Sequence, residues 1–187
     1  DEKTKEDAFY TNLEFGTAGM RGLIGAGTNR INIYVVRQAT EGLAQLIDSK
    51  GEEAKKRGVA IAYDSRHFSP EFAFESAAVL AKHGIKSYVF ESLRPTPELS
   101  FAVRHLNCFA GIMITASHNP PEYNGYKVYW EDGAQIVEPQ ASGIVNEVNS
   151  VDIFSDIKMI SEEEAKSRGL LEYIGKEIDD RFVEEVE

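Results

Sequence analysis

The sequence has almost no cysteine, a deficit of positive charge and no long apolar run. Its only cysteine, Cys108, cannot form an internal disulfide, which is typical of a protein from a reducing cytoplasm. The 187 residues include 20 Lys or Arg against 31 Asp or Glu, and the net charge of -11 argues against nucleic acid or an anionic membrane as a partner. We expect no membrane span and no signal peptide, because no apolar stretch is long enough and the first residues are polar. These absences predict a cytoplasmic protein.

The composition is that of a folded domain. A chain of this length with 42% hydrophobic residues can bury a core, and 27% charged residues are too few for a disordered chain. The charge is uneven, since residues 161–187 hold ten Asp or Glu and four Lys or Arg. We predict one domain over residues 1–150, followed by an acidic helical extension of the same domain over 151–187.

Apolar strands alternate with amphipathic helices along most of the chain. Strands are predicted at 59–63, 85–90 and 109–115, with a possible fourth at 128–130, and helices at 31–50, 69–82, 96–106 and 139–149. Ser69 is the expected N-cap of its helix, with Pro70 at the first position. A short helix is expected within residues 1–13, and one or two acidic helices near the end. This order predicts an α/β fold, a three-layer α/β/α domain with a mostly parallel, mixed sheet.

The chain is organised around the stretch from Gly111 to Pro121. An apolar strand breaks there into Thr-Ala-Ser-His-Asn and is stopped by two prolines. Ligands of α/β proteins bind beyond the carboxyl ends of the strands, where Asp64-Ser65-Arg66 also follows a strand. We expect both segments along one edge of the sheet. The plainer alternative is that Ser-His-Asn is ordinary turn chemistry.

A glycine-rich segment, residues 16–27, holds five glycines in twelve residues. Such a segment can point successive N–H groups at an anion, although a flexible surface loop is the alternative. It matches neither a P-loop nor a dinucleotide fingerprint. Arg21 lies within it and offers a permanent charge with a two-pronged guanidinium, as a phosphate site requires. We expect the segment to close over the sheet edge described above.

Ser117 is the candidate nucleophile. A serine hydrolase is disfavoured because the flanking residues lack the Gly-x-Ser-x-Gly pattern, and adjacent side chains such as His118 diverge on extended backbone. Phosphoryl transfer needs an acceptor, cationic groups around the phosphoryl oxygens, and a proton-handling group. Ser117, Arg21, Lys127 and His118 can supply these. Outside such a site, Lys127 would be a solvated surface lysine.

Four other residues with reactive side chains receive no role. Cys108 is expected to be a small buried hydrophobe beside the strand at 109–115. His67, His83 and His105 show no metal-ligand spacing and are expected at the surface or at helix caps.

Several segments together resemble the first domain of the α-D-phosphohexomutases, the phosphoglucomutase/phosphomannomutase family. They are Gly16-Thr17-Ala18-Gly19-Met20-Arg21-Gly22, Thr115-Ala116-Ser117-His118-Asn119-Pro120 and Asn124-Gly125-Tyr126-Lys127, with support from Tyr63-Asp64-Ser65-Arg66 and Pro95-Thr96-Pro97. The similarity covers roughly residues 13–150 and is best to the phosphoglucomutase and phosphopentomutase branch.

The resemblance implies an isomerase that works as an intramolecular phosphotransferase. Ser117 would carry a phosphoryl group and donate it to a hexose phosphate, giving glucose 1,6-bisphosphate as intermediate and activator. Mg²⁺ would bind an oxygen of the Ser117 phosphate, and either His118 or Lys127 would handle the proton. The residues implied to bind phosphate and substrate are Arg21, Thr17, Ser117, His118, Asn119 and Lys127.

The sequence departs from the family pattern at the metal. The family holds Mg²⁺ with an Asp-Gly-Asp-x-Asp loop of its second domain, and here the only adjacent aspartates are Asp179-Asp180. We therefore expect the N-terminal domain of a four-domain mutase, with the remaining domains as partners and little or no activity by itself. Phosphomannomutase, phosphopentomutase or phosphoglucosamine mutase specificity stays open, as does a non-catalytic module that binds sugar phosphate.

Overall fold

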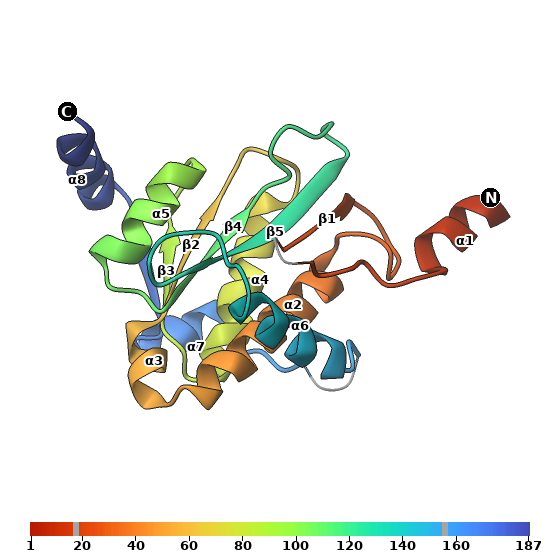
Figure 1. The fold of residues 1–187 in the computed structure, drawn as a ribbon, viewed down its shortest axis with the longest axis horizontal. Helices are drawn as coiled ribbons and strands as arrows, with labels where there is room; N and C mark the ends of the chain where they lie inside the picture. Colours follow the sequence, from red (N-terminus) through yellow and green to blue (C-terminus); the bar gives the residue numbers. More distant parts are fainter. Residues whose placement is uncertain (17–18, 155–156) are drawn as a thin grey trace.

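A mixed six-stranded sheet organises the computed structural model, which describes residues 1–16, 19–154 and 157–187 (Figure 1). The strand order is β1-β5-β4-β2-β3-β6. Strands β4, β2, β3 and β6 run parallel, whereas β5 is antiparallel to both β4 and β1. The strands are β1 Met20–Leu23, β2 Val59–Tyr63, β3 Ser87–Phe90, β4 Ala110–Ile114, β5 Tyr123–Trp130 and β6 Leu171–Ile174. The predicted mostly parallel, mixed sheet is confirmed.

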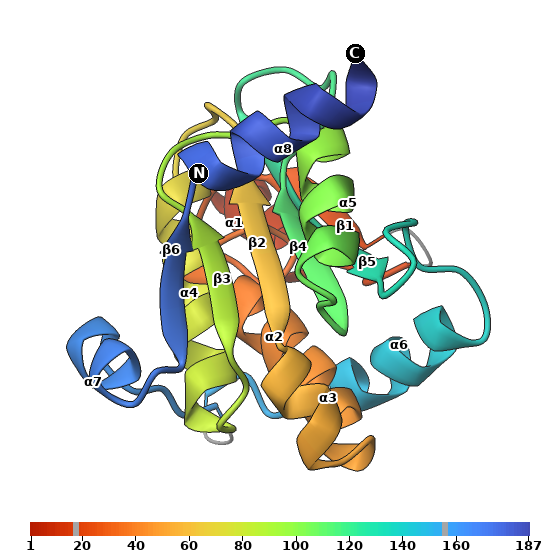
Figure 2. The same cartoon turned by 90° about the vertical axis from the view of Figure 1, so that its left-hand side faces the viewer.

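Helices cover both faces of this sheet and complete the predicted α/β/α layers (Figure 2). Helices α2 and α4 cover one face, with α6 packed against α2, and α5 covers the other face with α8 beside it. The helices are α1 Glu2–Phe9, α2 Ile33–Ser49, α3 Glu52–Arg57, α4 Ser69–Lys82, α5 Thr96–His105, α6 Gln140–Ser150, α7 Glu162–Ser167 and α8 Lys176–Val186. No helix in the described part of the chain is long and apolar enough to cross a membrane.

The two central strands are buried at every position because helices cover both of their faces. Their side chains alternate between two cores. Ile61 and Ile112 belong to the larger core under α2 and α4, and Ala62 and Met113 to the smaller core under α5. The carboxyl ends of β2 and β4 lie side by side, and those ends carry the candidate site.

The start of α4 differs from the prediction. Ser69 is inside the helix, and Phe68 occupies the cap position with left-handed backbone at φ 64°. The Ser69 hydroxyl donates to Asp64 Oδ1 at 2.9 Å instead of capping the helix. Pro70 lies in the first turn as predicted. The prediction of Ser69 as an N-cap was wrong because the hydroxyl serves the loop that follows β2.

Three short elements were not predicted from the sequence. Strand β1 lies within the glycine-rich segment, α3 within the charged residues 52–57, and β6 within the acidic end of the chain. Strand β6 pairs in parallel with β3, so the end of the chain contributes to the sheet as well as two helices. Strand β5 also begins at Tyr123, five residues before the predicted 128. The division of the chain after residue 150 stays a prediction.

The residues that received no role, Cys108 and the three histidines other than His118, lie as expected. Cys108 is fully buried, and burial raises the pKa of its thiol to about 12. His67 and His105 are exposed. His83 caps the end of α4, and its ring forms hydrogen bonds to Glu41 and Asp48 of α2.

Candidate functional site

The loops that follow β2 and β4 meet at the carboxyl ends of these two central strands, as predicted. Tyr63 and Ile114 are register partners at the ends of these parallel strands. Beyond them, residues 64–67 line a pocket of about 360 Å³ together with Ser117, Asn119 and Pro121. The pocket therefore lies where α/β proteins place their ligands.

Ser117 is exposed at this edge and has left-handed backbone, with φ at 59°. Such a conformation costs a serine on the order of 1–3 kcal/mol, so neighbouring groups must hold it. The Ser117 N–H donates to Thr115 Oγ1 at 2.9 Å, and a turn is closed by the Asn119 N–H and the Ala116 carbonyl at 3.1 Å. The Ser117 hydroxyl itself forms no hydrogen bond to a described residue. The hydroxyl is thus presented outward by a loop with defined backbone geometry.

Arg66 holds the backbone of the Ser117 loop. Its guanidinium donates to the carbonyls of residues 117, 119, 120 and 123 at 2.7 to 3.0 Å. Asp64 accepts the Thr115 hydroxyl at 2.6 Å and forms an ion pair with Arg66 at 3.3 Å. Sequence reasoning placed Arg66 at this edge but assigned it no role. The Asp-Ser-Arg segment immediately after a buried strand was the only signal available.

Arg21 reaches the same loop from the opposite end of the sequence. It lies on β1 opposite Gly125 of β5, and its Nη1 donates to Asn119 Oδ1 at 2.6 Å. Strand β1 therefore ties residues 20–23 of the glycine-rich segment to β5, and Arg21 brings this part of the segment to the Ser117 loop. Thr17, predicted to bind substrate, lies outside the described residues.

Lys127 lies on β5, directly opposite Met113 of β4. Burial lowers the pKa of Lys127 from its usual 10.5, and the positive charge of Arg21 lowers it further. Within the described residues the Lys127 side chain forms no ion pair or hydrogen bond. A lysine in this state can lose and regain a proton more easily than a solvated one.

His118 is exposed on the loop and makes no hydrogen bond to another described residue. Its place in the site follows from its position next to Ser117 in the chain. Within the described residues, no histidine is bonded to the Ser117 hydroxyl, and no catalytic triad of the serine hydrolase kind is assembled.

The described residues contain no cluster of three or more His, Cys, Asp or Glu side chains that could hold a metal ion. Asp64 is the carboxylate that lines the pocket beside Ser117, and both of its oxygens are occupied. Oδ1 accepts from the Arg66 N–H and the Ser69 hydroxyl, and Oδ2 accepts from Thr115. These residues do not make a magnesium site without a phosphate on Ser117 and ligands from outside the described chain.

Known proteins resemble the chain over most of its length. The family model for phosphoglucomutase/phosphomannomutase, alpha/beta/alpha domain I, matches residues 12–153. A phosphoglucomutase of Staphylococcus saprophyticus is 40% identical over 186 residues, which cover 99% of this chain and 33% of that protein. A human phosphopentomutase is 41% identical over 152 residues, which cover 76% of this chain and 25% of that protein.

A solved structure from Thermus thermophilus, described as a phosphomannomutase, superposes with a TM-score of 0.72 at 30% identity. The match covers 88% of this chain and 33% of that one. The chain thus spans about a third of the length of such relatives. From the matched domain and these relatives, we conclude that the chain belongs to the phosphoglucomutase/phosphomannomutase family and holds its α/β/α domain I.

Proposed function

We propose that this chain is the phosphoserine-carrying domain of a phosphoglucomutase-like enzyme that interconverts hexose 1-phosphate and hexose 6-phosphate. The observation that carries the proposal is the geometry of Ser117. Its hydroxyl is exposed on a loop with fixed backbone, and Arg21 contacts the same loop through Asn119. This combination suits a group that repeatedly accepts and donates a phosphoryl group.

In the proposed reaction, the bond between Ser117 Oγ and phosphorus breaks while a sugar hydroxyl forms a new bond to that phosphorus. The sugar hydroxyl gives its proton to a base, and the resulting bisphosphate reorients before its other phosphate returns to Ser117. Lys127 is the proposed base rather than His118, because burial and the positive charge of Arg21 lower its pKa, which is the direction that a lysine base requires. Arg21 stabilises the charge on the transferring group.

The other parts of the proposal concern groups outside this chain. Mg²⁺ would bind an oxygen of the Ser117 phosphate and supply further charge neutralisation, with its remaining ligands from other domains. Those domains would also bind the distal phosphate, so the chain alone should have little activity. Glucose 1,6-bisphosphate is the proposed intermediate and activator. We also propose a cytoplasmic setting with no nucleic acid or membrane partner.

Pentose phosphate is a second candidate substrate, because the relatives include a phosphopentomutase at 41% identity. The residues that line the pocket beside Ser117 give no ground for separating one sugar from another. Phosphomannomutase specificity is an alternative for the same reason, as is a non-catalytic module that binds sugar phosphate.

The test uses the full-length protein that contains this chain. After incubation with glucose 1,6-bisphosphate, peptide mapping by mass spectrometry should find one added phosphoryl group on Ser117. Ser117→Ala should abolish both the phosphoenzyme and turnover of glucose 1-phosphate. Ser49→Ala, at an exposed serine at the end of α2, should change neither. Near-native turnover by Ser117→Ala would refute the proposal.

A further inference from the structure

A closed circuit of interactions surrounds the backbone of Ser117. Its N–H donates to Thr115 Oγ1 at 2.9 Å, and the Thr115 hydroxyl donates to Asp64 Oδ2 at 2.6 Å. Asp64 pairs with Arg66 at 3.3 Å, and Arg66 Nη2 donates to the Ser117 carbonyl at 3.0 Å. The Ser117 carbonyl is therefore held directly by Arg66, and the Ser117 N–H is held by Thr115, whose hydroxyl is bonded to Asp64.

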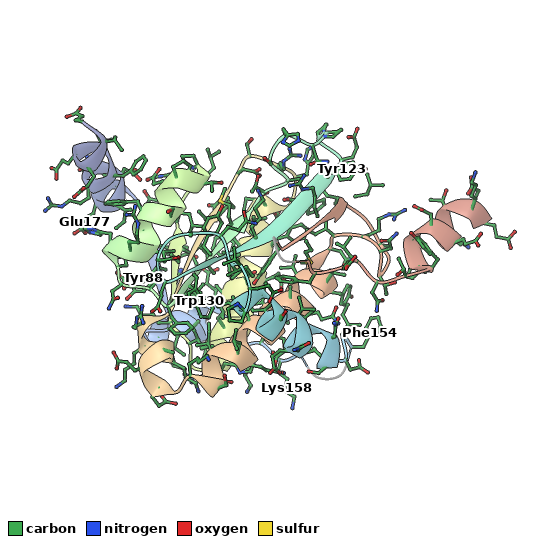
Figure 3. The ribbon with its side chains drawn as sticks, in the orientation of Figure 1. Tyr88, Tyr123, Trp130, Phe154, Lys158 and Glu177 are labelled. Carbon is green, nitrogen blue, oxygen red and sulfur yellow. The ribbon has the colours of Figure 1, made fainter. Side chains whose placement is uncertain are left out.

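The rest of the Arg66 guanidinium reaches the residues that follow. Nη2 also donates to the Asn119 carbonyl at 2.7 Å, and Nη1 donates to those of Pro120 and Tyr123 at 2.8 and 3.0 Å. Tyr123 is the first residue of β5, where the loop rejoins the sheet (Figure 3). One side chain thus gathers carbonyls from the whole loop, from Ser117 to the next strand.

Two consequences follow for a phosphoryl group on Ser117. A carbonyl oxygen bonded to Arg66 cannot at the same time turn its partial negative charge toward the phosphoryl oxygens. Ser117 is also kept at φ 59°, a conformation that a free serine rarely adopts. Reaction geometry is sensitive to such positioning, and a shift of about 1 Å can cost about 100-fold in rate.

We infer that Arg66 is a positioning residue for phosphoryl transfer, acting through the backbone of the Ser117 loop, and that Asp64 orients it. The inference rests on the proposed function of Ser117. Arg66 differs from the phosphate-binding cations in that its donors are spent on carbonyls and on Asp64. Loss of Arg66 should slow the chemical step without weakening the binding of the sugar phosphate.

The alternative is that Arg66 serves only the stability of the fold, and the chain offers a matched control for it. Arg57 also donates to two loop carbonyls, those of Asn107 and Cys108, and pairs with Glu131 at 2.7 Å. These contacts lie where β4 begins and β5 ends. The last residue of β5, Trp130, is at the opposite end of that strand from Tyr123 and the site (Figure 3). Removing Arg57 tests what an arginine bound to carbonyls contributes to stability alone.

The experiment compares Arg66→Gln, Arg66→Lys, Arg57→Gln and Ser117→Ala in the full-length enzyme. Turnover of glucose 1-phosphate is measured with saturating glucose 1,6-bisphosphate and divided by the amount of phosphorylated Ser117 from mass spectrometry. Arg66→Gln should lower kcat about 100-fold with KM changed by less than about threefold. Arg66→Lys should recover part of kcat, because a lysine restores the charge but reaches fewer carbonyls. Arg57→Gln should keep kcat near the native value, and urea unfolding reports the stability of each variant.

Each outcome decides one question. If kcat per phosphorylated Ser117 is native in Arg66→Gln while Ser117→Ala is inactive, Arg66 has no positioning role and the proposed function stands. The same conclusion follows if Arg66→Gln and Arg57→Gln lose kcat equally. Should Arg66→Gln fail to fold, Arg66→Lys decides, and native kcat in that variant overturns the inference. An active Ser117→Ala would overturn the proposed function itself.

Discussion

Gly125 is a position at which one added methyl group should disturb both the sheet and the site. A Cβ on Gly125 would lie 2.5 Å from the Thr115 carbonyl oxygen and 2.9 Å from that of Met20. Both contacts are to backbone of the neighbouring strands, so no side-chain rotation can relieve them. The backbone of β5 must shift, or the strands on either side must separate. Thr115 would then move, and with it the hydroxyl that holds the Ser117 N–H.

The expected cost of Gly125→Ala follows from this clash. Overpacking a well-packed interior costs about 1–3 kcal/mol. For a chain of this size, roughly 2–4 °C in Tm is lost per kcal/mol, so we expect Tm to fall by about 2–12 °C in differential scanning calorimetry. In the full-length enzyme, the phosphorylation of Ser117 by glucose 1,6-bisphosphate should slow as well, because Thr115 lies at the base of its loop.

Gly143→Ala is the matched control for Gly125→Ala. Gly143 lies inside α6, and a Cβ there would lie 3.6 Å from the nearest atom, Leu46 Cδ1, at ordinary contact distance. Alanine in a helix interior is favoured over glycine by about 0.5–1 kcal/mol, so this variant should keep or raise Tm. If Gly125→Ala matched Gly143→Ala in Tm, the backbone clash would be refuted as the reason for glycine at position 125.

Two pH dependences follow from His83 at the end of α4 and Glu98 in the first turn of α5. The hydrogen bond to Glu41 raises the pKa of His83 above 6.5 against the opposing effect of burial, and Asp48 adds to it. The resulting stabilisation is complete below pH 6.5 and is lost as pH rises through the folded-state pKa. In urea unfolding, His83→Gln should therefore lower the free energy of unfolding more at about pH 6 than at about pH 9, and equal losses would contradict the assignment. Burial raises the pKa of Glu98 from 4.5 to about 7, and Asp179 adds to the rise, so the folded state binds the extra proton. Stability should fall as pH rises from 4.5 to about 7, and Glu98→Gln should flatten that fall, whereas an unchanged slope would show that Glu98 is not its source.

Much of the sheet could be predicted from the sequence, because central strands bury both faces. Strands β2 and β4 are apolar at nearly every position, and that pattern is readable without a structure. The edge strands β1 and β6 lack it. They have four residues each, and Arg21, Glu172 and Tyr173 in them are exposed. Partners supplied by β5 and β3 make these segments strands, and short-range pattern does not show such pairing.

The site could be predicted in part for a similar reason. Ser117 and Asp64 both follow buried parallel strands, and neighbouring parallel strands end at the same edge, so their proximity was expected. The bonds between Arg66 and four carbonyls were not, because the direction of a carbonyl depends on local backbone angles. The left-handed φ of Ser117 is one of these angles, and residue spacing does not specify it.

An acidic protein can still bind phosphate if its cations are placed where carboxylates are absent. Arg66 is paired with Asp64, whereas Arg21 and Lys127 form no ion pair within the described residues. The positive charge of Arg21 lowers the pKa of Lys127, because the two side chains repel each other. Holding two like charges together costs free energy, and a bound anion converts that cost into attraction. A phosphoryl group that approaches this pair of cations would therefore be attracted locally even though the chain as a whole carries a net charge of -11.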